Sequence, residues 1–313
     1  MKIVFMGTTD FSVPILEGLL MNHEVSLVVT QPDRPYGRKQ TLKPSPIKEF
    51  ALSHQLRIFQ PEKIKVNYQP VLDESPDAII VAAFGQMIPK IILDYPKYKC
   101  INVHASLLPK YRGGSPMHTA IKNGELNTGV TIMYMAPKMD AGELLSQQSI
   151  PIKENDTVGT LERKLAIVGK ELLLETLAFI ENNSIQSYPQ DETQVTFAWN
   201  IKPEDELLDF TKSTLEVYNH VRAYNPWPVT HFVVNGLKIK VFEVAIANLP
   251  LETYSNILPG EVADIIKNEV YIRVKDGFIQ LKMIQPSGKN VMDIKAFMNG
   301  AGKSVFYVGK LLK

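Results

Sequence analysis

The chain has 313 residues, which is long enough for one large domain and a smaller second one. Its hydrophobic fraction of 45% and charged fraction of 21% are those of an ordinary globular protein, and they exclude a disordered or fibrous chain. The net charge is +1, but residues 265–313 hold nine Lys and Arg against three Asp and Glu. This basic segment hints at a polyanionic partner, although a solvated lysine surface would have the same composition.

No apolar run approaches the roughly 20 residues that a membrane-spanning helix needs, and the N-terminus lacks the features of a signal peptide. The lone cysteine, Cys100, cannot form an internal disulfide and is typical of a reducing compartment. We therefore expect a cytoplasmic protein without a membrane partner. We also expect a monomer, although the sequence does not itself show the oligomeric state.

In the first half, short β-branched runs alternate with helix-like stretches. The strand-like runs are residues 2–7, 24–31, 77–85 and 99–106, and residues 11–21 are helix-like. This alternation predicts an α/β fold with a doubly wound, Rossmann-like parallel sheet. Ligands bind such sheets beyond the carboxyl ends of the strands, which is where Phe84, Gly85, Gln86, Asn102 and His104 lie.

The second half changes character after a long helix predicted over residues 157–180. A polar stretch follows, then a helix-like segment near 213–223 and five closely spaced short strands. This pattern predicts a smaller OB-like β-barrel domain. We expect a catalytic domain over 1–183, a linker over 184–206 and a C-terminal domain over 207–313.

Residues 30–48 contain four prolines, and within 34–48 there are five basic residues and no acid. Proline and glycine at this density exclude a helix or a central strand, so we expect a long exposed loop. Such loops inside compact domains are usually functional or disordered.

The turn after the first strand invites comparison with a dinucleotide-binding fingerprint. That fingerprint needs three spaced glycines, and only Gly7 is present in this turn. A structural role for the turn is favoured, which argues against a nicotinamide oxidoreductase.

Asn102 and His104 leave a buried strand on one face, because strand side chains alternate with period two. Taken alone, they could equally be a core asparagine and a hydrogen-bonded histidine. The residues that follow decide the interpretation, because they run as Asn-Val-His-Ala-Ser-Leu-Leu-Pro-Lys-Tyr-Arg-Gly, and Gly-Val-Thr precedes an Asp-Ala-Gly at 140–142. Both motifs, in this order, resemble the signature of the folate-dependent formyltransferase family.

That resemblance implies 10-formyltetrahydrofolate as co-substrate and Asn102, His104 and Asp140 as the catalytic residues. We expect no metal, because the histidines at 104, 118, 220 and 231 lack the spacing of metal ligands. It implies that Asn102 stabilises an oxyanion, that His104 is a second oxyanion contact or a proton shuttle, and that Asp140 orients His104. The implied folate contacts come from two segments. They are Ser106, Leu107, Leu108 and Pro109, with Phe84, Gly85, Gln86 and Ile88 as further candidates.

The basic loop, residues 222–228 and residues 285–290 resemble family members whose acceptor is the α-amine of methionine on initiator tRNA. The resemblance then implies that Arg38 enters a groove of the tRNA and that Lys39 and Lys43 touch its phosphates. Three alternatives remain: a formyltransferase acting on a sugar amine or glycinamide ribonucleotide, a folate hydrolase, and an RNA-binding protein with a vestigial site.

Overall fold

The computed structural model describes residues 1–36 and 41–312, and they form two compact units. The first comprises Met1–Pro116, Asn127–Pro151 and Glu162–Trp199. The second comprises Met117–Leu126, Ile152–Leu161 and Asn200–Lys313. Within the described residues, no helix is both long and apolar enough to cross a membrane.

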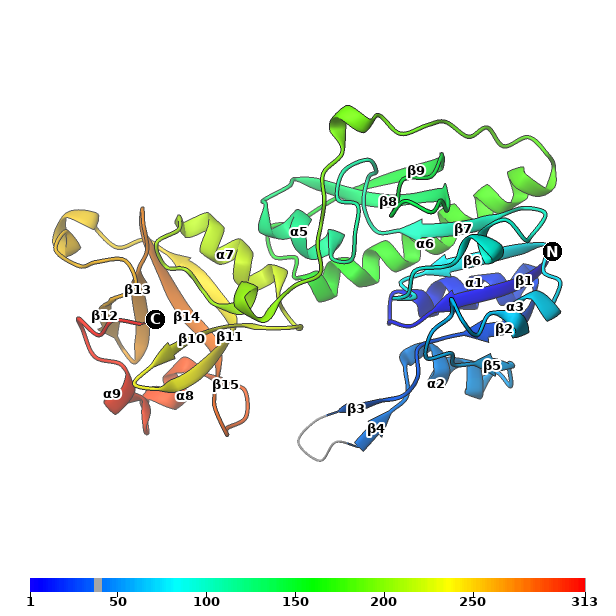
Figure 1. Ribbon diagram of the computed structural model, residues 1–313. Coiled ribbons are helices and arrows are strands. Elements are labelled where there is room, and N and C mark those ends of the chain that lie inside the picture. The colour runs from blue at the N-terminus through cyan, green and yellow to red at the C-terminus, as the bar shows by residue number, and fades with distance from the viewer. Residues whose placement is uncertain (37–40, 313) are drawn as a thin grey trace. The chain divides into compact units, whose positions relative to one another are not determined.

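The first unit is built on a seven-stranded, mostly parallel sheet (Figure 1). From edge to edge, its strands are β5 (Ile58–Phe59), β2 (Glu24–Val29), β1 (Lys2–Gly7), β6 (Ala78–Ala82), β7 (Cys100–His104), β8 (Asn127–Tyr134) and β9 (Leu144–Pro151). The first five are parallel, and β8 and β9 run antiparallel to their neighbours. The strand order reverses between β1 and β6, so the predicted doubly wound α/β sheet is confirmed.

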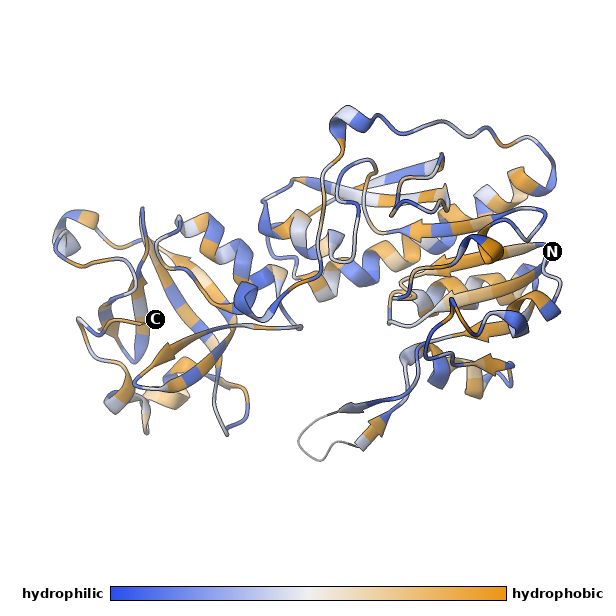
Figure 2. Cartoon of the chain, viewed as in Figure 1, coloured by the Kyte–Doolittle hydropathy of each residue, from blue (hydrophilic) through white to orange (hydrophobic). Residues whose placement is uncertain are grey.

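Helices cover both faces of this sheet, which explains why β1, β6 and β7 are buried along almost their whole length. Figure 2 shows β1, β2 and β6 mainly in hydrophobic colours. On one face, α3 (Gln69–Asp73) and α4 (Lys90–Leu93) supply Val71, Ile92 and Leu93 to a core that also contains Cys100. On the other face lie α1 (Ser12–Asn22) and α6 (Val158–Glu181). Gly169 of α6 packs closely on Val103 of β7, because a Cβ added at Gly169 would be 3.0 Å from Val103 Cγ1.

The turn after β1 is explained by packing. A Cβ on Gly7 would lie 2.8 Å from Ser12 Cβ and 3.0 Å from the carbonyl oxygen of Ala82. Glycine therefore lets the start of α1 approach β6 closely, which is a structural role.

The proline-rich segment contains more regular structure than a loop. β3 (Arg34–Tyr36) and β4 (Thr41–Lys43) pair antiparallel as a separate two-stranded sheet, and α2 (Pro46–Ser53) starts within the segment. Pro46 is tolerated because it stands at the start of the helix, and the Ser45 side chain accepts a bond from Lys48 N as N-cap. The prediction of a plain loop was wrong here, although the strands do stay outside the central sheet. Arg38 and Lys39 lie outside the described residues.

The second unit contains an antiparallel sheet in the order β10-β11-β14-β13-β12, with β15 paired to β14. Its strands are β10 (Thr230–Val234), β11 (Leu237–Ala247), β12 (Val262–Ile266), β13 (Glu269–Arg273), β14 (Phe278–Pro286) and β15 (Met292–Asp293). Its helices include α5 (Pro116–Lys122, beginning at the unit boundary), α7 (Thr214–Ala223), α8 (Ile294–Met298) and α9 (Gly302–Val305). Alternating strand residues, with Val217 of α7 and Phe297 of α8, enclose one apolar core. The predicted small, separate β domain is confirmed.

Residues 188–199, within the segment we predicted as a linker, belong to the first unit. Tyr188 pairs with Leu144 of β9, and Phe197 pairs with Arg112. Short 3-10 turns occur at Glu192–Gln194, Pro203–Glu206 and Leu251–Tyr254. The polypeptide from Tyr188 to Trp199, called the strap below, therefore lies across the loops that follow β7 and β8.

Candidate active site

The central feature is the face of β7 that carries Cys100, Asn102 and His104 at alternate positions. Cys100 lies in the apolar core, where its thiol donates to the Ile92 carbonyl at 3.4 Å and burial raises its pKa. The other two residues follow toward the carboxyl end of the strand, so this face changes from apolar to polar along its length. Burial makes Cys100 an inert thiol.

Asn102 is 9% exposed, and its side chain has no hydrogen bond within the described part of the chain. Its side-chain N and O are not among the buried atoms that lack a partner, so the amide is reached by solvent. Its donors and acceptor are therefore available to a bound molecule.

The orientation of the His104 ring is set by one backbone contact. Nε2 lies 3.0 Å from the carbonyl oxygen of Tyr111, and a carbonyl can only accept, so Nε2 carries the proton of the neutral ring. Nδ1 is then the acceptor nitrogen, and it lies 3.8 Å from Asp140 Oδ2, beyond hydrogen-bond distance. This geometry makes Nδ1 the nitrogen that can exchange a proton with a substrate.

Asp140 lies in the loop between β8 and β9, with a left-handed φ of 48°. Its Oδ2 accepts a 2.8 Å hydrogen bond from the Gly113 backbone N–H. Gly113 has a φ of 125°, and a Cβ there would lie 2.4 Å from the Ala198 carbonyl oxygen. Only glycine fits between the strap and Asp140, so Gly113 is a site residue in its own right.

The turn that contains Ser106, Leu107, Leu108 and Pro109 is closed by a local hydrogen bond and by Thr131 of β8. Ser106 Oγ donates to the Lys110 carbonyl at 2.7 Å, and Thr131 Oγ1 donates to the Ser106 carbonyl at 2.6 Å. Leu108 N donates to Thr131 Oγ1 at 3.1 Å, and Leu108 is buried. The Ser106 hydroxyl and the Leu108 N–H are thus occupied by the fold.

The second group of predicted folate contacts follows β6. Phe84 and Ile88 belong to the apolar core, whereas Gly85 is exposed with a φ of 86°. The Gln86 side chain accepts from Ile64 N at 2.8 Å and donates to the Pro61 carbonyl at 3.1 Å. Of these residues, only Gly85 offers an exposed backbone.

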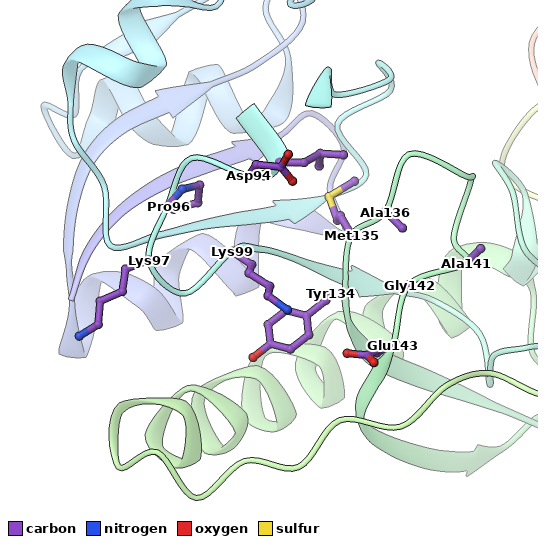
Figure 3. A pocket seen from close by; sticks show the side chains of 11 residues that line it. Asp94, Pro96, Lys97, Lys99, Tyr134, Met135, Ala136, Ala141, Gly142 and Glu143 are labelled. Carbon is purple, nitrogen blue, oxygen red and sulfur yellow. The ribbon is translucent and has the colours of Figure 1, made fainter. Parts of the chain in front are cut away.

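A cavity of about 560 Å³ lies beside the Asp140 loop (Figure 3). It is lined by Leu93, Asp94, Pro96, Lys97, Lys99, Tyr134, Met135, Ala136, Ala141, Gly142 and Glu143. The Lys99 ammonium lies 4.5 Å from the centre of the Tyr134 ring. The volume suits a small ligand. No predicted folate contact lines it.

Arg112 is completely buried, as a structural side chain would be. Its Nη2 donates to Glu192 Oε1 at 2.7 Å and to Gln190 Oε1 at 2.8 Å. The guanidinium, followed by Lys138, lowers the pKa of the Glu192 carboxyl to about 2. In the described residues, His, Cys, Asp and Glu do not gather into a metal-binding group of three or more.

Sequence reasoning did not single out Tyr111, Gly113, Thr131 or Gln190. Tyr111 and Gly113 act through backbone atoms, which leave no side-chain signal, although the Gly-Gly pair at 113–114 marks unusual backbone. Gln190 lies 50 residues from Asp140 along the chain, and no local pattern links the two.

A mostly parallel sheet that ends in an asparagine amide without a protein partner and a histidine facing a carboxylate is the fold and site expected of a formyltransferase. A family described as "Formyl transferase" matches residues 1–177, and "Formyl transferase, C-terminal domain" matches residues 200–302. The chain belongs to the formyl transferase family.

Close relatives carry a more specific name. Methionyl-tRNA formyltransferase of Staphylococcus epidermidis (strain ATCC 12228 / FDA PCI 1200) is 47% identical over 99% of both chains. Methionyl-tRNA formyltransferase of Streptococcus pneumoniae serotype 19F (strain G54) is 46% identical over 97% of both.

Solved structures share the fold. HypX from Aquifex aeolicus in complex with tetrahydrofolic acid superposes with a TM-score of 0.68 at 19% identity, over 98% of this chain and 50% of that chain. A sugar 3N-formyl transferase, WlaRD, superposes with a TM-score of 0.64 at 24% identity, over 93% and 99%. At these identities the likeness shows the fold alone.

Proposed function

We propose that the chain transfers the formyl group of 10-formyltetrahydrofolate to the α-amine of methionine esterified to initiator tRNA. The observation that carries this proposal is the 47% identity, over 99% of both chains, to a methionyl-tRNA formyltransferase. This reaction serves translation initiation, and its tRNA substrate implies the cytoplasm as its location.

The amine is the nucleophile, and it needs little activation. A free α-amine has a pKa of about 7.7–8, and the neighbouring ester lowers it, so a neutral fraction exists near pH 7. Attack forms the N–C bond to the formyl carbon and places negative charge on the formyl oxygen. Asn102 donates to this oxygen, since its amide has no protein partner and is reached by solvent. One such donor is typically worth about 3 kcal/mol.

Proton transfer falls to Nδ1 of His104. Because Nε2–H is bonded to Tyr111, Nδ1 takes the proton from the attacking nitrogen. The bond from the formyl carbon to N10 then breaks, and the same proton passes to N10 of tetrahydrofolate. Asp140, with its Oδ2 3.8 Å from Nδ1, stabilises the imidazolium that exists between the two transfers.

Folate binding is proposed for the two turns that frame β6 and β7. The leucines of residues 106–109 would pack against the pterin, the exposed backbone of Gly85 would bond it, and Ile88 would support the pocket from the core.

Recognition of tRNA is proposed for the basic segment that includes the β3–β4 ribbon. Arg38 would read a groove of the acceptor end, and Lys39 and Lys43 would contact phosphates. Lys43 lies in β4, where it is exposed. The basic C-terminal segment would add further phosphate contacts, and the chain would act as a monomer.

The test compares acceptor amines under one set of conditions. Purified protein is given 10-formyltetrahydrofolate with charged initiator tRNA, free methionine or an amino sugar nucleotide, and kcat/KM is measured for each. We expect charged tRNA to exceed the other acceptors by at least a hundredfold. Equal or better use of an amino sugar would contradict the proposal, and formate release without any acceptor would indicate a hydrolase.

A further inference from the structure

The loop that carries Asp140 must be held in place by contacts outside itself. Its left-handed φ of 48° is an uncommon conformation for a non-glycine residue and costs free energy. Within the loop, the Ala141 N–H reaches the Lys138 carbonyl only at 3.3 Å. Gly142 lies so close to the Tyr134 carbonyl that a Cβ would be 1.8 Å from its oxygen.

Gln190 of the strap makes the outside contacts. Its Nε2 donates to the backbone carbonyls of Asp140 and Gly142, both at 2.8 Å. Its Oε1 accepts from Nε and Nη2 of Arg112, at 3.1 and 2.8 Å. A side-chain amide has two donor hydrogens and two acceptor lone pairs, so every one of them is used.

These bonds close a ring around Asp140. The Gln190 side chain links the Asp140 carbonyl to Arg112 by hydrogen bonds. Gly113, which follows Arg112 in the chain, donates its N–H to the Asp140 carboxylate. Both links to Asp140 therefore involve adjacent residues, Arg112 and Gly113, of the loop after β7. The same loop supplies the Tyr111 carbonyl that orients His104. The ring fixes the Asp140 carboxylate relative to the imidazole by hydrogen bonds at both ends.

We propose that Gln190 is a positioning residue for the formyl transfer, acting through the Asp140 loop. This inference rests on the proposed function. Misplacing a catalytic group by about 1 Å can cost about a hundredfold in rate. Gln190 itself lies on the strap, which keeps its own pairing with Leu144 through two backbone bonds at Tyr188, of 2.9 and 3.1 Å. Removing the amide therefore releases the loop and leaves the strap in place.

Two substitutions separate the two ends of the amide. Gln190→Ala removes all four bonds, whereas Gln190→Glu keeps the acceptors for Arg112 and loses the donors to the Asp140 loop. We expect both variants to lower kcat by tenfold to a hundredfold, with KM for the folate within twofold of wild type. Gln194→Ala is the matched control, because Gln194 is on the same strap but donates to Asp191, and it should leave kcat unchanged.

A double-mutant cycle distinguishes positioning from general support of the fold. If Gln190 acts through Asp140, Gln190→Ala should lower kcat less than twofold in an Asp140→Asn background, measured in single turnover at high enzyme concentration. A full additional loss in that background would overturn the inference, as would normal kcat in Gln190→Glu. Failure of the proposed function gives a different result, because the wild-type protein itself would not formylate charged tRNA.

Discussion

At the residue scale, the proposed proton transfer depends on the hydrogen bond from His104 Nε2 to the Tyr111 carbonyl. It leaves Nδ1 as the proton acceptor and turns that nitrogen toward Asp140, which lies 3.8 Å away. The two residues should therefore act as a unit, with the carboxylate acting on the protonated ring.

Substitution of His104 or Asp140 should lower kcat and leave the affinity for folate unchanged. We expect His104→Ala and Asp140→Ala to lower kcat by about 10² to 10⁴, because each removes a proton-transfer or charge-stabilising group. Steady-state kinetics and folate binding by fluorescence titration check this. Near-wild-type kcat in either variant would remove that residue from the catalytic set.

Gly113 combines a left-handed backbone with close packing, so its replacement should be costly. Gly113→Ala would place a Cβ 2.4 Å from the Ala198 carbonyl oxygen and would disturb the N–H that holds Asp140. We expect a loss of about 2–4 kcal/mol in unfolding free energy, from strain and overpacking together. Urea denaturation measures it.

Gly85 provides the matched comparison in the same unit. It has a φ of 86°, but a Cβ would have its nearest neighbour at 3.5 Å, so Gly85→Ala adds strain without a clash. Its cost should be about 1 kcal/mol. Equal losses in the two alanine variants would show that packing against the strap is unimportant.

At the element scale, β3 and β4 form a sheet separate from the one that carries the proposed catalytic residues. Recognition of tRNA and chemistry should therefore be separable by mutation. Arg38→Ala should raise KM for charged tRNA about tenfold or more while KM for the folate stays unchanged, since an arginine contact with a base edge contributes about 1–3 kcal/mol. Initial-rate kinetics with each substrate varied in turn check it.

Salt dependence gives a second readout for the same element. The log–log slope of tRNA affinity against salt should be shallower by about 0.9 for each phosphate that the protein no longer neutralises, as in Lys43→Ala. Lys65→Ala, an exposed lysine outside the ribbon, should keep the wild-type slope. A wild-type slope near zero would indicate an uncharged acceptor.

Much of the fold could be predicted from sequence because its determinants are local. β-branched runs predicted the strands, and period two placed Asn102 and His104 on one face of β7. The ribbon and the start of α2 were missed because proline content suggested only a loop, whereas Pro46 is well tolerated at a helix start. The hydrogen bonds that Asp140 receives from the Gly113 backbone and from the Gln190 amide join residues that are 27 and 50 positions apart. No local sequence pattern predicts such contacts.

At the scale of the whole molecule, two partly buried histidines in the second unit link stability to pH. Burial, the largest cause, lowers the pKa of His118 and of His220 to about 4. The unfolded chain binds these protons below about pH 6.5, so stability is full above that value and falls as the pH decreases toward 4. Each histidine contributes up to about 3 kcal/mol of this loss.

Chemical denaturation between pH 7 and pH 4 measures this loss directly. His220→Gln removes one titrating group, so the fall in unfolding free energy between pH 7 and pH 4 should be smaller by the contribution of one histidine. His54→Gln is the control, because His54 is exposed and should leave the profile unchanged. A second unit that is as stable near pH 4 as near pH 7 would contradict the assignment of neutral histidines in the folded state.

The central claim is that the formyl group passes from the folate to one amine on charged tRNA. The most direct measurement is a single-turnover reaction with 10-formyltetrahydrofolate labelled in its formyl carbon, quenched in acid, with the ester then hydrolysed and the amino acid analysed by mass spectrometry. We predict that the label appears as N-formylmethionine, in a one-to-one ratio with the tetrahydrofolate formed. Recovery of the label as free formate, or on any other acceptor, would contradict the proposed reaction.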